Sequence, residues 1–244
     1  MNSDTEPQPQ SDGSNAHVLA EFKGRARVIL RVEGLPGISR RVLQRLRRKP
    51  RHHCFCVVSL PLDRSIPVRP LALEVEIHPL GLQDDEYLAV IDALNENGNT
   101  CEDLLKRLSD GQRCFLAVDH GRIASWSWWQ NGKFEIGSLG RRFQLAPHEA
   151  YYYDGFTPPE YRGKRIHAYL LAQAASAIGR SDGRTIGLAF IHTANHDSRH
   201  SSAAAGATHV GWVGFIEILG IRFHYLRGRH VLPATTRRLY FERT

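Results

Sequence analysis

One short stretch combines positive charge with the start of a helix. Residues 162–165 read Arg-Gly-Lys-Arg, between a strand predicted at 150–156 (AYYYDGF) and an apolar helix predicted at 164–178. The first amides of a helix have no intrahelical partner, and the helix dipole adds positive potential there, so this place suits an anion. Nearby cationic side chains strengthen that preference. The chemistry that this spacing indicates is the binding of a pyrophosphate group.

The composition also favours an anionic partner. The 244 residues carry a formal net charge of +7 and a pI near 9.5, which suits a phosphorylated cofactor, a nucleic acid or an acidic membrane surface. Helix-turn-helix, zinc and RNA-binding signatures are missing from the sequence, so a basic nucleic-acid-binding protein is the weaker alternative and we expect no nucleic acid partner. No apolar run approaches the roughly 18 residues of a membrane span, which predicts a soluble protein.

The four cysteines indicate a reducing compartment. Cys54 and Cys56 lie two residues apart in an apolar strand, so both sulfurs share one face, and we predict a buried, reduced pair. The usual ligand spacing of a zinc site is missing, so we expect no metal. Reduced cysteines predict a cytoplasmic location, with a peripheral position at the membrane as an alternative.

The pattern along the chain is α+β. We predict strands at 25–32, 54–60, 71–77, 113–119, 122–129, 134–139, 150–156, 185–191, 210–219 and 221–227, and helices at 39–51, 84–98, 101–108, 164–178 and 197–205. Two prolines in 63–71 indicate a connector. We therefore expect a disordered tail at 1–16, a strand-helix-strand extension at 17–70, a main domain at 71–228 and a C-terminal tail at 229–244.

Two blocks of the main domain resemble the GCN5-related N-acyltransferases (GNAT superfamily). Residues 159–164, Pro-Glu-Tyr-Arg-Gly-Lys, match the start of that family's acyl-CoA pyrophosphate loop residue for residue. Asn195 follows the next strand and Gly206 comes eleven residues later, as in the family. Two glycines of the family's loop fall on Arg165 and His167, which restricts the close approach that glycine permits. The resemblance implies a GNAT-like central mixed, mostly antiparallel β-sheet flanked by helices.

The resemblance also implies an activity and a cofactor. The activity is acyl-CoA-dependent N-acyl transfer, from acetyl-CoA, a longer acyl-CoA or a carrier-protein thioester to a small-molecule, sugar or lipid amine. In this family the strand before the loop parts from its neighbour, and the opening receives the pantetheine arm. By resemblance, the cofactor-binding residues are Phe156, Thr157, Arg162, Gly163, Lys164, Arg165, Ile166, His167 and Asn195.

Direct attack of an amine on a thioester needs a base, stabilisation of the oxyanion and an acid for the thiolate. The family often uses a Tyr seven residues after the Asn as the acid, but Ser202 stands there. Because a serine hydroxyl is a poor acid, either Ser202 orients a water or another group protonates the sulfur. For the base we favour Asp154, with Glu149, His192 and His196 as alternatives, while a structural acceptor is the other interpretation of Asp154. These departures keep a catalytically degenerate binding or regulatory protein as an alternative.

The predicted helix 39–51 is strongly basic. It carries seven Lys or Arg residues around an apolar stripe of Val42, Leu43 and Leu46. A solvated face is the ordinary interpretation of such a helix. The functional alternative is a contact with an acyl carrier protein or an anionic membrane surface. A homodimer is a further expectation.

Overall fold

The computed structural model describes residues 50–94 and 100–228, and every structural statement below concerns these ranges. The predicted tail at 1–16, the strand at 25–32, nearly all of the basic helix 39–51 and the tail at 229–244 lie outside them. The described residues fall into two compact units. One spans His52–Phe215 and resumes at His224, and the other contains Arg51 and Ile216–Phe223. Each unit is described by itself.

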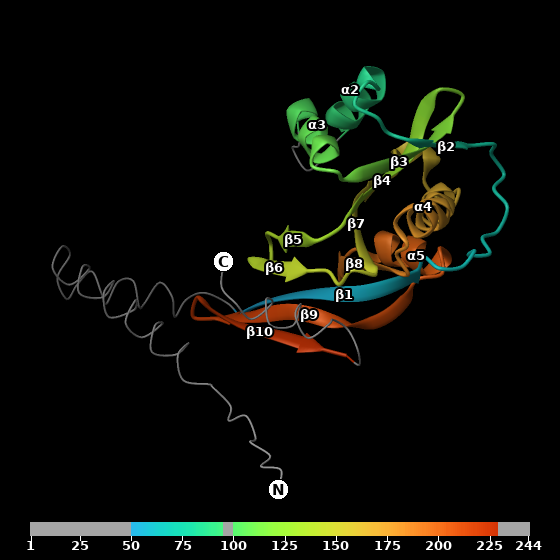
Figure 1. The fold of residues 1–244 in the computed structure, drawn as a ribbon. Helices are drawn as coiled ribbons and strands as arrows, with labels where there is room; N and C mark the ends of the chain where they lie inside the picture. Colours follow the sequence, from blue (N-terminus) through green and yellow to red (C-terminus); the bar gives the residue numbers. More distant parts are fainter. Residues whose placement is uncertain (1–49, 95–99, 229–244) are drawn as a thin grey trace, which may run out of the picture. The chain divides into compact units, whose positions relative to one another are not determined.

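One large mixed sheet is the centre of the fold. Its strand order is β10-β9-β1-β8-β7-β4-β3-β2 (Figure 1). The pairs β1–β8, β2–β3, β3–β4 and β4–β7 are antiparallel, and β7–β8 is parallel. The strands are β1 (Arg51–Pro61), β2 (Glu76–Pro79), β3 (Arg113–Asp119), β4 (Arg122–Gln130), β7 (Glu149–Phe156), β8 (Ile186–His192), β9 (Thr208–Ile218) and β10 (Ile221–Arg227). The predicted mixed, mostly antiparallel sheet is confirmed.

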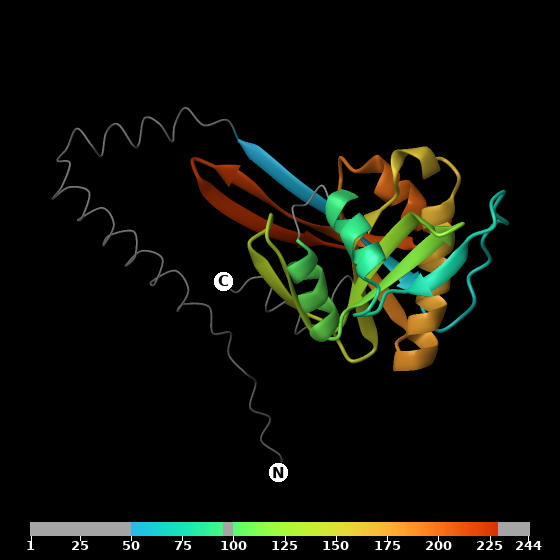
Figure 2. The same ribbon diagram turned by 90° about the horizontal axis from the view of Figure 1, so that it is seen from above.

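Helices cover both faces of the sheet at β3 and β4 (Figures 1 and 2). Alternate residues of β3 explain this: Leu116 packs with one group of helices, whereas Phe115 packs with the other. The first group is α2 (Asp85–Leu94) and α3 (Cys101–Ser109), and the second is α4 (Ile166–Asp182) and α5 (His196–Ala204). A separate two-stranded sheet pairs β5 (Lys133–Ile136) with β6 (Arg141–Gln144).

The hairpin between β3 and β4 forms where the sequence predicts it. His120 and Gly121 have φ values of 47° and 79°, and two central residues with positive φ define the turn that matches the twist of paired strands. The strands β4 and β7 then carry buried aromatic residues into the core, among them Trp128, Trp129 and Tyr152. These aromatic side chains fix the position of β7, which leads into the loop at 162–165.

Strand β1, expected within an N-terminal extension, lies inside the main sheet between β8 and β9. It pairs with β8 from Phe55↔His192 to Pro61↔Ile186. Both faces of β1 are apolar, since Val57 packs in one core cluster and Val58 in the other. A strand that is apolar on both faces fits a central position, because each face must be covered. The proline-containing residues 63–71 connect β1 to the rest of the sheet.

Strand β2 is shorter than the predicted strand 71–77. Its register with β3 runs from Glu76↔Val118 to Pro79↔Phe115, so residues before Val75 would lie opposite the turn that follows Asp119. They have no strand to pair with there. The alternation of apolar residues in 71–77 was nevertheless informative, because Leu71, Leu73 and Val75 pack against the main core.

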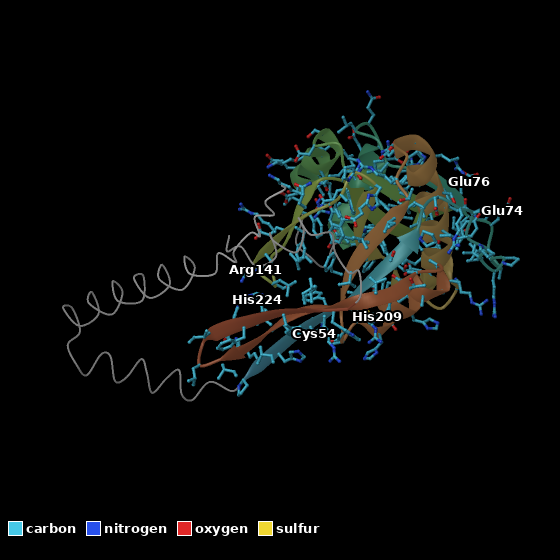
Figure 3. All side chains as sticks on the ribbon, turned by 60° about the horizontal axis from the view of Figure 1, so that its bottom comes forward. Cys54, Glu74, Glu76, Arg141, His209 and His224 are labelled. Carbon is cyan, nitrogen blue, oxygen red and sulfur yellow. The ribbon has the colours of Figure 1, made fainter. Side chains whose placement is uncertain are left out.

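The cysteines match the predicted reduced state. All four are free thiols, and Cys54 and Cys56 of β1 are buried. Figure 3 labels Cys54 on this strand. Burial raises the pKa of Cys56, although the nearby Arg199 lowers it in part. No group of His, Cys, Asp or Glu side chains among the described residues could hold a metal ion. Within the same residues, no helix has both the length and the apolar character that a membrane crossing requires.

Candidate active site

The parallel strands β7 and β8 part from each other after three residue pairs. Their register is Glu149↔Ile186, Ala150↔Gly187 and Tyr151↔Leu188, yet β7 continues to Phe156 and β8 to His192. Their second halves pair with β4 and β1 on the outer sides, whereas the edges that face each other form no further strand pairs. Such an opening is what the sequence resemblance implied for the pantetheine arm.

A bulge interrupts β7 beside this opening. Trp126 of β4 pairs with Phe156 of β7, and Trp128 pairs with Tyr153. The two paired positions are therefore two residues apart in β4 but three residues apart in β7. β7 accommodates its extra residue at Asp154, whose φ is 47°. Bulges of this kind redirect side chains and are frequent next to active sites.

The Asp154 carboxylate is held by an arginine that the sequence analysis did not single out. Arg107 on α3 donates from Nη1 to Asp154 Oδ2 over 2.6 Å, and the Asp154 side chain is 10% exposed. The guanidinium also lies 5.1 Å from the Trp128 ring centroid and 5.4 Å from that of Tyr153. This ion pair joins α3 to the bulge, which agrees with the structural interpretation of Asp154 and limits its freedom to act as a base.

The loop after β7 presents cations around a helix start that lacks a side-chain cap. A short 3-10 turn, η1 (Pro159–Tyr161), comes first, and Arg162 Nε then donates to the Thr157 carbonyl over 3.0 Å. Lys164 and Arg165 are exposed. Arg165 is the N-cap residue of α4, has a φ of 63° and makes no side-chain capping bond.

The first hydrogen bond of α4 runs from the Tyr169 amide to the Arg165 carbonyl over 3.1 Å. The amides of Ile166, His167 and Ala168 form no hydrogen bond with another described residue. Unpaired amides at a helix start are an anion site when cations stand beside them.

His167 occupies a position where the family's loop has glycine, and a glycine in β7 makes room for it. A Cβ on Gly155 would lie 2.5 Å from His167 Cε1, so the imidazole fills the space that a side chain at 155 would need. His167 as a whole residue is half-buried, and desolvation of its imidazole lowers the pKa of His167 to about 4. His167 is therefore neutral at pH 7.

Ser125 connects this imidazole to the backbone of the opening. Its Oγ donates to the Phe156 carbonyl over 2.8 Å and lies 2.8 Å from His167 Nδ1 and 3.1 Å from Thr157 Oγ1. Because a hydroxyl has one proton, the bond to Phe156 requires His167 to donate from Nδ1. The network holds the segment 156–157, where the sequence resemblance places backbone contacts to the pantetheine arm.

The second block of the resemblance surrounds α5. Asn195 caps this helix by accepting from the Ser198 amide over 3.0 Å. Ser202 is 2% exposed and lies close enough to the Tyr152 hydroxyl to lower its pKa, although burial raises that pKa more. The Tyr152 hydroxyl has no hydrogen bond of normal geometry to a described residue.

His192, the third predicted catalytic residue, ends β8. Its Nδ1 accepts from the Ala194 amide over 3.2 Å, and its ring packs edge-on against Phe55, with centroids 5.2 Å apart. Phe55 belongs to the core cluster that contains the β5–β6 aromatic residues, whereas Ser202 neighbours Tyr152 of the other cluster. Asp154, Ser202 and His192 thus have different immediate surroundings.

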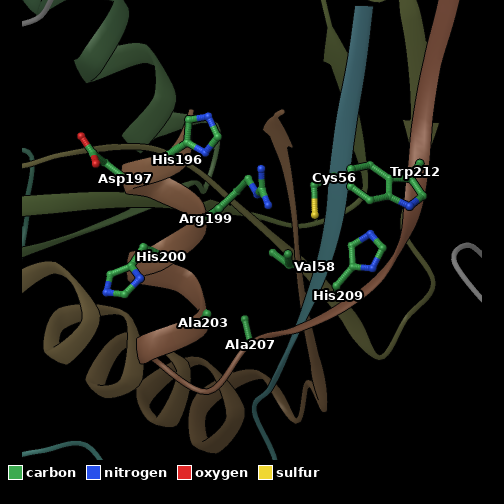
Figure 4. A pocket seen from close by; sticks show the side chains of 10 residues that line it. All are labelled: Cys56, Val58, His196, Asp197, Arg199, His200, Ala203, Ala207, His209 and Trp212. Atoms are coloured by element: carbon green, nitrogen blue, oxygen red, sulfur yellow. The ribbon is translucent and has the colours of Figure 1, made fainter. Parts of the chain in front are cut away.

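A pocket of about 720 Å³ is lined by residues of α5, β1 and β9 (Figure 4). Its wall on α5 includes Arg199, which donates to the Thr193 carbonyl over 3.1 Å. Its wall on β9 is formed by His209 and Trp212, whose ring centroids are 4.5 Å apart. Cys56 and Val58 of β1 also line it. The predicted cofactor-binding residues 156–167 do not contribute to this pocket.

Sequence reasoning found the loop but missed the side chains that support it. Arg107, Ser125 and Gly155 come from α3, β4 and β7, and no local motif marks them. Gly155 carried a weak signal, because glycine within a predicted strand indicates a bulge or a close approach. Its partner at position 167 could not be named without the fold.

Parted parallel strands followed by an uncapped, cation-rich helix start define an α+β protein with a candidate anion site at the start of α4. No protein-family model matches the sequence, and no curated protein matches it either. Solved structures do match the fold. One is a GCN5-related N-acetyltransferase from Sphaerobacter thermophilus, with 16% identity, a TM-score of 0.51 and coverage of 80% of this chain and 58% of that chain.

Two further structures are similar at lower scores. A tandem GNAT protein from the clavulanic acid biosynthesis pathway has 16% identity, a TM-score of 0.48 and coverage of 70% and 55%. An acetyltransferase of the GNAT family from Colwellia psychrerythraea has 11% identity, a TM-score of 0.47 and coverage of 73% and 57%. The chain thus spans 55% to 58% of the length of these three structures. It has the GNAT fold.

Proposed function

We propose that the protein is an acyl-CoA-dependent N-acyltransferase. The observation that carries this proposal is the anion site at the start of α4, placed directly after a strand that parts from its parallel neighbour. A diphosphate would accept hydrogen bonds from the unpaired amides of residues 166–168 and pair with Lys164 and Arg165. The pantetheine arm would then follow the backbone of Phe156 and Thr157 into the opening.

The remaining loop residues have supporting roles in this proposal. Gly163, with a φ of 75°, lets the backbone turn toward the phosphates. Arg162, Ile166 and His167 complete the donor-bearing loop, and Asn195 fixes the start of α5 on the far side of the opening. The acyl donor is acetyl-CoA or a longer acyl-CoA, and the acceptor is an amine.

The reaction is direct attack of a neutral amine on the thioester carbonyl. The nitrogen–carbon bond forms, the carbon–sulfur bond breaks, the amine proton passes to a base, and the CoA thiolate takes up a proton. Asp154 is our candidate base, with His192 as the alternative, provided that the ion pair with Arg107 opens when the amine binds. Ser202 would orient a water that protonates the sulfur.

A second candidate is a binding or regulatory protein that takes acyl-CoA without turning it over. The specific observation in its favour is that two of the predicted catalytic groups are occupied or covered. Asp154 is paired with Arg107, and Ser202 of α5 is 2% exposed. Both candidates predict binding of acyl-CoA, and only the first predicts turnover.

One set of measurements separates them. Acyl-CoA should raise the melting temperature under both proposals, because it binds the folded state preferentially. Only the acyltransferase should also release free CoA thiol, which is measured with acetyl-CoA and longer acyl-CoAs against a panel of amines. One of those amines should then gain the mass of the acyl group. Stabilisation without thiol release would support the binding protein. Absence of any stabilisation by CoA or acyl-CoA would refute both.

A further inference from the structure

The pocket lined by α5, β1 and β9 combines apolar and polar walls. Its volume of about 720 Å³ lies within the usual range of ligand pockets. Val58, Ala203 and Ala207 give it an apolar surface, whereas Arg199 on α5 and Trp212 on β9 bring polar hydrogens to it (Figure 4). All of its lining residues belong to one compact unit. A mostly apolar cavity with a few convergent polar groups is the usual form of a small-molecule site.

Arg199 is a half-buried cation without a carboxylate partner among the described residues. Its Nη1 donates to the Thr193 carbonyl over 3.1 Å, and no other hydrogen bond or ion pair joins its side chain to them. In Figure 4 the side chain extends from α5 toward Cys56 of β1. Burial raises the pKa of the Cys56 thiol, and the charge of Arg199 lowers it in part. Because a guanidinium has five N–H groups, most of its donors are left for a ligand oxygen.

The wall of the pocket on β9 is aromatic. The ring centroids of His209 and Trp212 are 4.5 Å apart, and Trp212 is half-buried. The indole N–H of Trp212 forms no hydrogen bond with another residue in the described ranges. An indole stacks well with a second ring and also donates a hydrogen bond. With the apolar Val58 in the same pocket, this wall suits a flat aromatic group.

The charges around the pocket favour a ligand with one negative charge. Asp197 is the one acid among the described lining residues, and it is exposed in the first turn of α5. Its repulsion of an anion is screened by water, whereas the charge of the half-buried Arg199 is screened less. His196 and His200 add N–H donors even when their imidazoles are neutral. A carboxylate carries one charge, but a phosphate monoester carries nearly two at neutral pH, and Arg199 would leave one of them unbalanced.

We propose that this pocket binds a small aromatic carboxylate. The carboxylate accepts hydrogen bonds from Arg199, and the aromatic ring packs on Trp212 and Val58. Residues 156–167 and Asn195, the predicted acyl-CoA contacts, do not line this pocket. The aromatic carboxylate is therefore a second ligand of the protein, and its binding does not require acyl transfer.

Three probes test the ligand class by isothermal titration calorimetry of the full-length chain. Naphthoate has the carboxylate and the rings, naphthalenemethanol has nearly the same shape without the charge, and inorganic phosphate has charge without a ring. Naphthoate should bind at least ~10-fold more tightly than either of the other two, because the alcohol lacks the charge-assisted hydrogen bonds and phosphate lacks the ring contact. Equal affinities for naphthoate and the alcohol would overturn the proposal. So would tighter binding of phosphate, or no binding of naphthoate at millimolar concentration.

Two variants test where naphthoate binds. Arg199→Gln should weaken its binding by ~10-fold or more and leave binding of the alcohol unchanged, since only the charged contact is lost. The control is Arg180→Gln, which removes an exposed charge on α4 and should bind naphthoate as the wild type does. Trp212→Leu should weaken the binding of both naphthoate and the alcohol by ~10-fold, because both lose the stacking surface.

The control for Trp212→Leu is Phe223→Leu, which removes a ring of β10 that is 56% exposed. It should not change the affinity for naphthoate. If Phe223→Leu weakens binding as much as Trp212→Leu does, naphthoate binds exposed apolar surface and the proposal is wrong. Wild-type affinity in Arg199→Gln would refute it as well. Melting temperatures verify that each variant is folded, and the comparison of the three probes on the wild type decides the ligand class even where a variant does not fold.

Competition with CoA separates this pocket from the start of α4. Naphthoate should bind with the same affinity in saturating CoA, and also in the variant with Lys164→Ala and Arg165→Ala. Displacement of naphthoate by CoA, or loss of its binding in that variant, would assign it to the candidate anion site and overturn the proposal. A chain that binds naphthoate through Arg199 but does not bind CoA would refute the proposed function and support the pocket as a separate ligand site.

Discussion

Two connections in this protein run from a parallel strand to a helix, and they begin their helices differently. The first leads from β7 to α4 and the second from β8 to α5. In the second, Asn195 accepts from the Ser198 amide and so closes the helix start with the chain's own side chain. In the first, Arg165 stands at the N-cap without a capping bond, and the following amides are unpaired. A helix that leaves its donors unpaired is ready for an external anion, and only the first connection adds exposed cations.

The difference in capping also predicts which substitutions change ligand affinity and which change stability. An N-cap side chain typically contributes about 1 kcal/mol to the stability of a helix. The chain forgoes that contribution at α4, the longer helix, and accepts a non-glycine residue with positive φ at Arg165. Both features cost stability unless a ligand uses them. Substitutions in the first connection should therefore change ligand affinity most, whereas those in the second should change stability.

The largest expected effect comes from removing cations at α4. Lys164→Ala with Arg165→Ala should lower the affinity for acyl-CoA by roughly 100-fold, because two charge-assisted contacts to phosphate are lost. Isothermal titration calorimetry with CoA measures this change. The control is Lys133→Ala with Arg180→Ala, which removes two exposed charges elsewhere. The control therefore has the same net charge as the variant with Lys164→Ala and Arg165→Ala. A comparable loss in the control would indicate that only the overall charge matters.

The part of this comparison that the sequence predicted is the loop itself. Residues 159–164 pointed to a candidate anion site because a strand, a basic turn and a helical run follow one another within one local stretch. That order of strand, turn and helix is present in the structure, and so is the equally local hairpin at 120–121. Strand 71–77 and strand β1 were placed less well, since a strand's length and position depend on distant partners, here β3 and β8.

The supporting residues of the site show the same limit. Asp154 was named for its place in β7, but its partner Arg107 is 47 positions away in the sequence. His167 was recognised as a departure from the resemblance, whereas the compensation by Gly155 requires knowledge of how α4 packs on β7. Local signals thus locate the site, and contacts between elements decide how each residue in it behaves.

The pH dependence of stability gives the next effect. The pKa of His167 is lowered to about 4 in the folded state, against about 6.5 in an unfolded chain. Between these values the unfolded state binds the proton and the folded state does not. The free energy of unfolding should therefore fall as the pH drops from 6.5 to 4, by on the order of 2 to 3 kcal/mol. Urea denaturation of wild type and His167→Gln over this range checks the slope, which should be smaller in the variant.

A somewhat smaller effect tests the packing of α4 on β7. Gly155→Ala should destabilise the protein by about 2 kcal/mol, because overpacking a filled site forces neighbours to shift. His167→Ala in the same chain should restore much of that loss by removing the ring that the new Cβ meets. Gly137→Ala is the control, since a Cβ there has no neighbour within 4 Å. If the double variant is no more stable than Gly155→Ala, the two residues do not compensate each other.

The smallest effect concerns the capped helix. Asn195→Ala should lower the free energy of unfolding by about 1 kcal/mol, because the Ser198 amide loses its acceptor, whereas Asn195→Ser should retain most of the stability. Arg165→Gly at the corresponding position of α4 should change stability in the opposite direction, since glycine adopts a φ of 63° without strain. Chemical denaturation of the three variants measures these changes. If both connections responded alike, the uncapped start of α4 would be an ordinary helix end, and its unpaired amides would no longer favour an anion site.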